Sequence, residues 1–177
     1  MRRPLLVAGA VLAVALVALA GVLVWADLPY PHLPAGAKAD RLVVLKGRHE
    51  LLLLSHGRTL ATYRVALGKH PAGPKQQQGD GRTPEGLYFI DYHKPDSSFY
   101  RALHLSYPSA ADWKRATARG VDPGGAIMIH GVRPRLRALG RLHRLVDWTD
   151  GCIAVTNPEM DQIFAAVSDG TPVELRP

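Results

Sequence analysis

The sequence predicts a mainly β domain, a sandwich or small barrel with one or two short helices, preceded by an N-terminal transmembrane helix. Short apolar segments, several of them rich in β-branched residues, alternate with turn residues from residue 40 onward, which is typical of strands. Helical apolar spacing is confined to two brief stretches. The chain has 177 residues, which leaves room for one globular domain and a short additional segment.

The first element is an uninterrupted apolar run from Leu5 to Ala26 that contains no charged residue. About 20 such residues suffice for a helix to cross the hydrocarbon core of a bilayer. Arg2 and Arg3 precede the run, and this asymmetry predicts a cytoplasmic N-terminus. We therefore expect residues 1–26 to form a single-pass anchor in the cell membrane, with the remainder on the extracytoplasmic, periplasmic side. Sites with small residues inside the run leave a cleaved signal peptide as the alternative.

Residues 27–39 are rich in Pro, Gly and Ala and predict a stalk, so the globular domain is expected over residues 40–177. A polar loop with many glycines and prolines is expected over 68–84. Two helices are expected, over 109–119 and 158–167, the second with Pro158 in its first turn. Strands are expected over 41–46, 50–55, 59–67, 86–91, 102–107, 126–130, 152–155 and 171–175.

Charge and cysteine content restrict the function classes. The chain carries 22 Lys and Arg against 15 Asp and Glu, a formal net charge of +7. Outside the cytoplasm such a domain meets anionic wall polymer or lipid head groups, so we expect no nucleic-acid partner; a solvated basic surface without a partner is the alternative. The single cysteine excludes an internal disulfide, a Cys-x-x-Cys redox pair and a zinc site built from several cysteines.

The single cysteine, Cys152, lies in the segment Asp-Trp-Thr-Asp-Gly-Cys-Ile-Ala-Val-Thr-Asn. Gly151 permits an unusual turn directly before it, at the start of a short strand. A thiol at a strand edge beside free N–H groups has the layout of a nucleophile with an oxyanion hole. The alternative is a buried cysteine that acts as a small apolar side chain.

A histidine suited to activate this thiol ends the buried strand predicted over 126–130. His130 is followed by Gly131, and a backbone carbonyl just after it is expected to orient the imidazole. As a base it would take the proton of Cys152 to form a thiolate–imidazolium pair and later protonate the leaving amine. His143 is the rival base. A metal site of His130, His143 and Cys152 would match no compact ligand spacing, and we expect neither a metal nor another cofactor.

Two motifs together resemble a known family. One comprises His130-Gly131, the segment Thr149-Asp150-Gly151-Cys152-Ile153, and Asn157. The other is the upstream stretch Gly-Asp-Gly-Arg-Thr-Pro-Glu-Gly-Leu-Tyr over residues 79–88. In this order they resemble the active-site signatures of the L,D-transpeptidase (YkuD-type) catalytic domain, over residues 41–175.

The resemblance implies a β-sandwich-like fold and a cysteine acyl-enzyme mechanism on peptidoglycan stem peptides, in cell-wall biogenesis and cell shape. It implies that Cys152 is the nucleophile and His130 its base. The carbonyl of Gly131 would orient the base, and the N–H groups of Gly151 and Cys152 would form the oxyanion hole.

The sequence departs from the family pattern at two positions beside the cysteine. Many members have a histidine where this chain has Asp150 and an arginine where it has Ala154. The stretch between His130 and Cys152 is also longer than in typical members and contains five arginines, which as a default form a solvated loop. Our hypothesis is that one or two of them bind substrate carboxylates. The expected substrate-binding residues are Arg133, Arg144, Thr149, Asp150 and Asn157.

Two alternatives to a transpeptidase remain at this stage. One is a peptidoglycan hydrolase or amidase of the same fold that cleaves cross-links or lipoprotein attachments, since the segment around Cys152 resembles a subgroup in which some members hydrolyse. The other is a non-catalytic module that binds the cell wall.

Overall fold

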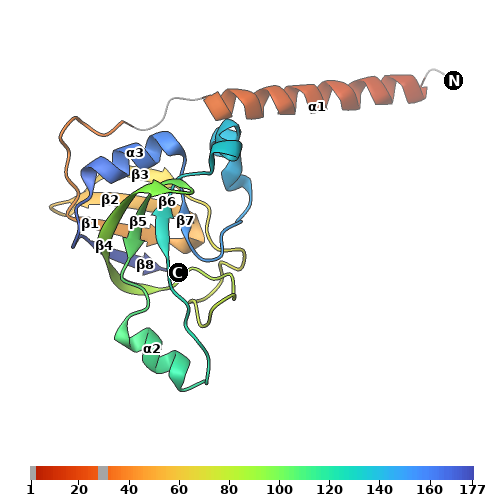
Figure 1. Ribbon diagram of the computed structural model, residues 1–177. Helices are drawn as coiled ribbons and strands as arrows, with labels where there is room; N and C mark the ends of the chain where they lie inside the picture. The colour runs from red at the N-terminus through yellow and green to blue at the C-terminus, as the bar shows by residue number, and fades with distance from the viewer. Residues whose placement is uncertain (1–2, 28–31) are drawn as a thin grey trace. The chain divides into compact units, whose positions relative to one another are not determined.

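The computed structural model describes residues 3–27 and 32–177, in two units that divide after residue 30 (Figure 1). The first unit contains one helix, α1 (Arg3–Asp27). No helix within the described residues is both long enough and apolar enough to span a membrane. The structure therefore does not support the transmembrane helix predicted from the sequence.

The second unit is mainly β, which confirms the predicted fold class at that level. Within residues 32–177 eight strands form a sheet in the order β3-β2-β1-β8-β4-β5-β6-β7. The strands are β1 (Arg41–Leu45), β2 (Glu50–Ser55), β3 (Arg58–Arg64), β4 (Gly86–Ser97), β5 (Tyr100–Leu105), β6 (Met128–His130), β7 (Ile153–Ala154) and β8 (Pro172–Arg176).

The long strand β4 joins two halves of this sheet. Its first part, Gly86–Phe89, pairs with β8, and its later part pairs with β5 from Ile90 onward, with a register shift between Ile90 and Tyr92. The two ends of the strand order also meet, because Ala66, just after β3, exchanges backbone hydrogen bonds of 3.0 and 2.8 Å with Ala154 in β7. The sheet thus curls around one core and brings β7 close to the segment that follows β3.

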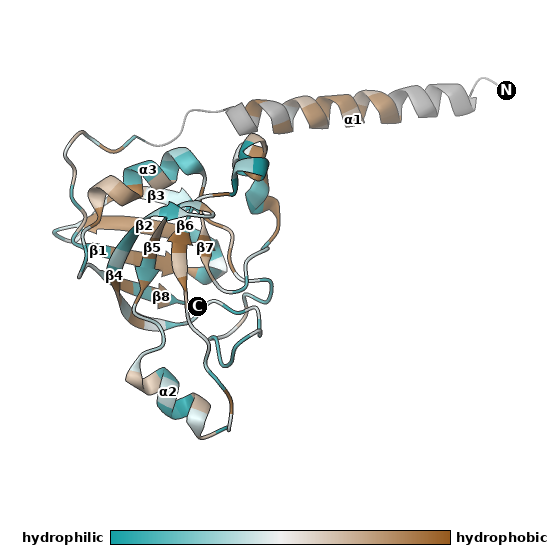
Figure 2. Ribbon diagram, in the orientation of Figure 1, coloured by the Kyte–Doolittle hydropathy of each residue, from teal (hydrophilic) through white to brown (hydrophobic). Residues whose placement is uncertain are grey.

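The interior of the domain is filled from both halves of the sheet and from one helix. Helix α3 (Asn157–Ala166) places Met160 and Ile163 in the core, where both are fully buried. Figure 2 shows the apolar residues concentrated along the strands of the sheet. Other fully buried side chains are Leu42, Leu51, Leu53, Leu67, Ile90, Leu103, Leu105, Ile129 and Ile153. Burial of such aliphatic groups stabilises the fold by about 1.5–3 kcal/mol each.

The helices begin at capping residues. Helix α2 (Ala110–Thr117) starts after Ser109, which forms a reciprocal capping box with Asp112. Before α3, the carboxylate of Glu159 accepts hydrogen bonds from the backbone N–H and the hydroxyl of Thr156 at 3.0 and 2.8 Å. Two 3₁₀ segments complete the list, η1 (Lys46–Arg48) and η2 (Pro134–Leu145), and η2 is kinked at Gly140, which has φ +46°.

Several predicted boundaries differ from the structure. The strand expected over 126–130 begins only at Met128, because Ala126 adopts a left-handed φ of +55°. Strand β4 extends to Ser97 because it continues into a hairpin with β5. The predicted stalk of residues 27–39 lies partly outside the described residues. Its second half packs on α3, where the N–H of Leu33 donates to Gln162 and that of Ala39 donates to Ala166.

Candidate active site

The pairing of two short strands brings the predicted nucleophile and base together. Strands β6 and β7 run parallel, with Ile129 opposite Ile153 and His130 opposite Ala154. Cys152 directly precedes β7, and His130 is the last residue of β6. Residues 22 positions apart in the sequence thus come from adjacent strands at one edge of the domain.

The turn that carries the thiol is held by hydrogen bonds of Thr149. Its hydroxyl donates to the carbonyl of Cys152 at 2.7 Å and accepts from the N–H of Gly151 at 3.1 Å. Its backbone N–H donates to the carbonyl of Leu67 at 3.1 Å. Thr149, predicted to bind substrate, thereby fixes the shape of the turn before the nucleophile.

This bonding alters the expected oxyanion hole. Gly151 has φ +132°, a conformation that side chains disfavour, and its N–H is engaged by the Thr149 hydroxyl. A Cβ at this position would also lie 2.5 Å from the carbonyl oxygen of Arg82. In this structure Gly151 therefore allows a close backbone approach. Its N–H was expected to be a free donor for an oxyanion, but it is bonded to the Thr149 hydroxyl.

Cys152 is half-buried, and its thiol contacts the backbone at the cavity wall. Its Sγ lies 3.5 Å from the carbonyl oxygen of Ala126, to which the S–H donates. Burial raises the pKa of the Cys152 thiol, and the nearby charge of Asp150 acts in the same direction. The backbone N–H of Met128 and the ammonium of Lys75 oppose this rise. The net shift favours the neutral thiol in the free protein.

The imidazole of His130 is buried and oriented as predicted. Its Nδ1 donates a hydrogen bond of 2.6 Å to the carbonyl of Gly131, since a carbonyl can only accept. Nε2 is therefore the nitrogen available to receive a proton. Burial lowers the pKa of His130 to about 4, and the charge of Arg133 adds to the decrease.

These two shifts bear on the expected thiolate–imidazolium pair. A raised thiol pKa and a lowered imidazole pKa both favour neutral groups near pH 7. Both directions thus disfavour a thiolate–imidazolium pair in the free protein. A neutral imidazole in this position would be suited to take the thiol proton as the sulfur attacks, and not to hold a preformed thiolate.

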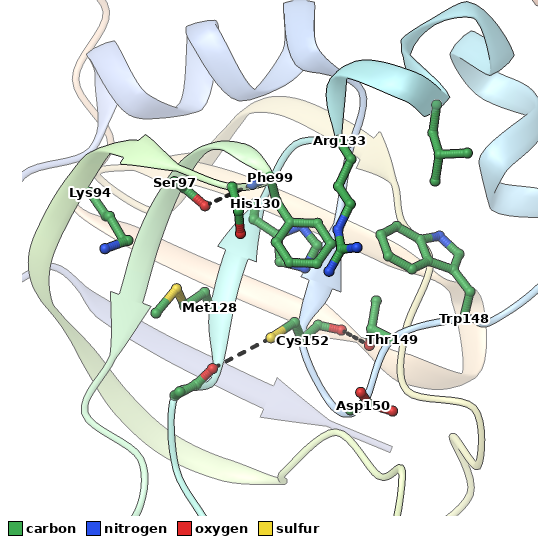
Figure 3. A pocket seen from close by; sticks show the side chains of 13 residues that line it. Lys94, Ser97, Phe99, Met128, His130, Arg133, Trp148, Thr149, Asp150 and Cys152 are labelled. Carbon is green, nitrogen blue, oxygen red and sulfur yellow. Dashed lines mark hydrogen bonds between the residues drawn. The ribbon is translucent and has the colours of Figure 1, made fainter.

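Both groups open into one cavity of about 480 Å³ (Figure 3). It lies against the β6–β7 edge and is closed on one side by the β4–β5 hairpin. The residues that line it are Lys94, Ser97, Ser98, Phe99, Ala126, Met128, His130, Arg133, Leu136, Trp148, Thr149, Asp150 and Cys152. An open, partly apolar cleft with a thiol and an imidazole in its wall is suited to hold a peptide for acyl transfer.

Two aromatic rings enclose the imidazole. The ring of Phe99 lies 4.6 Å from that of His130 between centroids, and Trp148 lies 5.8 Å away, edge to face. The guanidinium of Arg133 stacks 4.5 Å above the Phe99 ring. Sequence reasoning gave no role to Phe99, because it follows a strand far from either motif and reaches the site only through the β4–β5 hairpin.

The predicted substrate-binding residues are found in different places. Arg133 and Asp150 line the cavity, and Asp150 pairs with Lys69 at 2.8 Å. Arg144 lies outside the cavity lining and forms a buried ion pair with Glu159. This difference arises because η2 folds back on α3, so its second half turns toward the core.

Asn157 also lies away from the cavity wall. Its Oδ1 accepts from the N–H of Val132 at 2.7 Å. The same oxygen would be 2.5 Å from a Cβ on Gly131, so this glycine leaves space for the amide. Asn157 thus fixes the backbone just after His130, so its presence in the motif is explained by the positioning of His130.

The rival base His143 is buried behind Trp148. Its Nδ1 accepts a hydrogen bond of 3.4 Å from the Trp148 indole N–H, and burial lowers the pKa of His143 to about 3. His143 does not line the cavity. Among the described residues no group of three or more His, Cys, Asp or Glu side chains is arranged to hold a metal ion.

The polar loop expected over 68–84 packs against the turn that carries Cys152, through contact of Arg82 with Gly151. Asp80 accepts hydrogen bonds from the backbone N–H groups of Gln76, Gln77 and Arg82 and pairs with the buried Lys75 at 2.8 Å. These bonds hold the pKa of Asp80 below its usual value. The Arg82 carbonyl packs on Gly151, which accounts for the joint presence of the two motifs.

Comparison with known proteins identifies the domain. The family model of the L,D-transpeptidase catalytic domain (YkuD) matches residues 39–175. The chain belongs to the L,D-transpeptidase catalytic-domain family. This confirms the resemblance drawn from the two motifs.

Among curated L,D-transpeptidase relatives, the putative L,D-transpeptidase YafK of Escherichia coli K12 is 34% identical over 111 residues. This match covers 62% of the present chain and 37% of YafK, so the chain spans well under half the length of that relative.

Solved structures share the L,D-transpeptidase fold. The helical cell shape determining protein Pgp2 of Campylobacter jejuni superposes with a TM-score of 0.60 at 23% identity, over 80% of this chain and 48% of Pgp2. An L,D-transpeptidase of Mycobacterium smegmatis gives a TM-score of 0.51 at 14% identity, over 77% and 58% of the two chains. At these identities the likeness concerns the fold alone.

Proposed function

We propose that this protein is a cysteine-dependent L,D-transpeptidase that acts on peptidoglycan stem peptides outside the cytoplasm. The observation that carries the proposal is the shared cavity of Cys152 and His130, with the Nδ1 of His130 bonded to the Gly131 carbonyl. Membership of the L,D-transpeptidase family supports the substrate class. The location follows from the substrate, because peptidoglycan lies on the extracytoplasmic side.

In the first half-reaction the Cys152 sulfur attacks the carbonyl carbon that precedes the terminal D-alanine of a tetrapeptide stem. Nε2 of His130 takes the thiol proton as the C–S bond forms. When the tetrahedral intermediate collapses, the C–N bond breaks and the same proton passes to the departing amine of D-alanine. The products of this step are free D-alanine and a thioester on Cys152.

In the second half-reaction an amine of a neighbouring stem or of a lipoprotein attacks the thioester. His130 removes a proton from the amine and returns it to the sulfur as the C–S bond breaks, which regenerates the thiol. Asp150 is the carboxylate among the residues that line the cavity, where it pairs with Lys69 at 2.8 Å.

Arg133 is the residue we assign to a substrate carboxylate. It lies in the cavity wall and is held over the ring of Phe99, so its guanidinium is preorganised to bind a carboxylate with two hydrogen bonds. Ala154, where many members have an arginine, is fully buried and bonded to Ala66. In this chain the cation that binds the substrate carboxylate would therefore be Arg133, from the connection between β6 and β7.

Incubation with purified tetrapeptide muropeptides tests the proposal. We expect release of D-alanine, a covalent adduct on Cys152 detected by mass spectrometry, and cross-linked product when an amine acceptor is added. Cys152→Ser should form no thioester adduct and release no D-alanine. Turnover by Cys152→Ser at the wild-type rate would refute the mechanism, whereas release of D-alanine without cross-linked product would identify a hydrolase.

A further inference from the structure

The connection between β6 and β7 exposes apolar side chains beside the active-site cavity. Figure 2 shows hydrophobic and hydrophilic residues alternating along it. We call residues 133–146 the basic–apolar segment. Its exposed apolar residues, with the exposed fraction of each, are Leu136 at 37%, Leu139 at 42%, Leu145 at 68% and Val146 at 65%. Apolar groups gathered on one short surface segment mark an interaction site more often than scattered ones do.

The same segment exposes cationic side chains between the leucines. Arg135 and Arg137 are both exposed, and neither forms an ion pair with a carboxylate among the described residues. Leu136 and Leu139 are three residues apart in a 3₁₀ segment, so they lie on one face. Cations and apolar groups are therefore presented together.

Buried side chains anchor the basic–apolar segment to the rest of the domain. The Arg144 guanidinium pairs with the buried carboxylate of Glu159, and Arg141 and His143 are buried. The exposed position of Leu145 and Val146 is therefore fixed by the buried residues that precede them. This rigidity means that the apolar groups are presented without the cost of ordering a loop on binding.

We propose that the basic–apolar segment docks the catalytic domain on an anionic lipid surface. Interleaved leucines and arginines suit the boundary of a bilayer, where apolar groups enter the acyl region and guanidinium groups remain at the phosphates. Hydrophilic wall polymer would satisfy the arginines and leave the leucines in water. A second copy of this chain would bring like charges together, which opposes association.

Docking has a consequence that rests on the proposed function. Arg133 and Leu136 belong both to the segment and to the cavity wall. Contact of the segment with lipid therefore places the mouth of the cavity at the bilayer surface. Acyl donors or acceptors carried on a lipid would then be preferred over soluble stems.

The docking itself is tested with a fluorescent label and does not depend on turnover. In the full-length Cys152→Ser protein, Val146→Cys is labelled with an environment-sensitive fluorophore and mixed with vesicles of phosphatidylglycerol and phosphatidylcholine. We expect a blue shift and quenching by lipids spin-labelled on the acyl chain, because such segments enter about 5–10 Å into the interface. The label attached to Lys114→Cys on α2, at the other end of the domain (Figure 1), should show neither.

The charge contribution is tested in the same labelled protein. Arg135→Gln with Arg137→Gln should weaken vesicle binding roughly 25-fold and reduce the shift accordingly, because each arginine strengthens partition by roughly fivefold. The matched pair Arg58→Gln with Lys114→Gln removes the same charge from exposed positions elsewhere and should retain it. A label at position 146 that stays in water with anionic vesicles would overturn the proposal. So would a concentration-dependent shift without lipid, or one produced by a soluble anionic polymer alone.

Discussion

The Cα of Gly151 lies against the carbonyl of Arg82, so that a Cβ on Gly151 would be 2.5 Å from the Arg82 oxygen. This contact joins the loop of the first motif to the turn of the second and sets where the backbone of Cys152 lies. A glycine is required here for two separate reasons. A Cβ would collide with the Arg82 carbonyl, and the φ of +132° is disfavoured for residues with a side chain.

Gly151→Ala should therefore displace the nucleophile. We expect a loss of unfolding free energy of about 1–3 kcal/mol from backbone strain, and loss of the acyl adduct even where the variant is folded. The matched control is Gly170→Ala, since Gly170 also has a left-handed φ, +84°, but its Cβ would meet open space. Equal losses of activity in both variants would show that the Arg82 contact has no special role.

The ionisation state of the thiol can be read from alkylation. Burial raises the pKa of Cys152 and lowers that of His130 to about 4, so thiolate should be scarce at pH 7. We expect the iodoacetamide rate to climb steadily with pH and to reach half its limit above the ordinary thiol pKa. His130→Asn should leave this profile nearly unchanged. A rate plateau between pH 5 and 8 that His130→Asn removes would instead reveal a thiolate–imidazolium pair.

Acid should destabilise the domain through its buried histidines. The folded-state pKa values of His130 and His143 are lowered to about 4 and about 3, so protons bind more readily to the unfolded chain. The stability they contribute is complete above their ordinary pKa and is lost as the pH falls toward the folded values. For His130 the loss amounts to about 3 kcal/mol. Denaturant unfolding at several pH values between 7 and 4 measures it.

His143→Gln isolates one of these protons. The glutamine carbonyl can still accept from the Trp148 indole but does not titrate, so the slope of unfolding free energy against pH should decrease below pH 6.5. His56→Gln is the control, because the side chain of His56 is 95% exposed. An unchanged slope in His143→Gln would mean that His143 is not buried as a neutral group.

Two arginines of the basic–apolar segment should separate stability from binding. Arg144→Met leaves the buried Glu159 carboxylate without its cation, and removal of one partner of a buried pair costs about 3–5 kcal/mol. Arg133→Met should alter stability little, because Arg133 is exposed, but should raise KM for stem peptides. Thermal unfolding and saturation kinetics of both variants make the comparison. A raised KM in folded Arg144→Met with an unchanged Arg133→Met would reverse the assignment.

Most strands and helices could be predicted from the sequence because they depend on local residue patterns. Alternating apolar residues and turn residues predicted most strands to within a few positions, and Ser109 and Pro158 indicated the two helix starts. The strand predicted from residue 126 begins later because Ala126 has a φ of +55°, and its carbonyl accepts from the Cys152 thiol, a contact between distant parts of the chain. The packing of residues 33–39 on α3 was not predicted, because nothing in the composition of that segment indicates it.

The sequence by itself determined the chemical groups of the site, since a single thiol, a histidine at a strand end and two ordered motifs are properties of residue order. Only the tertiary structure decided which neighbours act on those groups. Pairing of β6 with β7 brought His130 to the thiol, the β4–β5 hairpin added Phe99, and folding of η2 onto α3 removed Arg144 from the cavity while leaving Arg133 in it. The reason is physical: burial, charge and hydrogen bonding act through space, so the pKa values and roles of these residues depend on contacts that no sequence interval specifies.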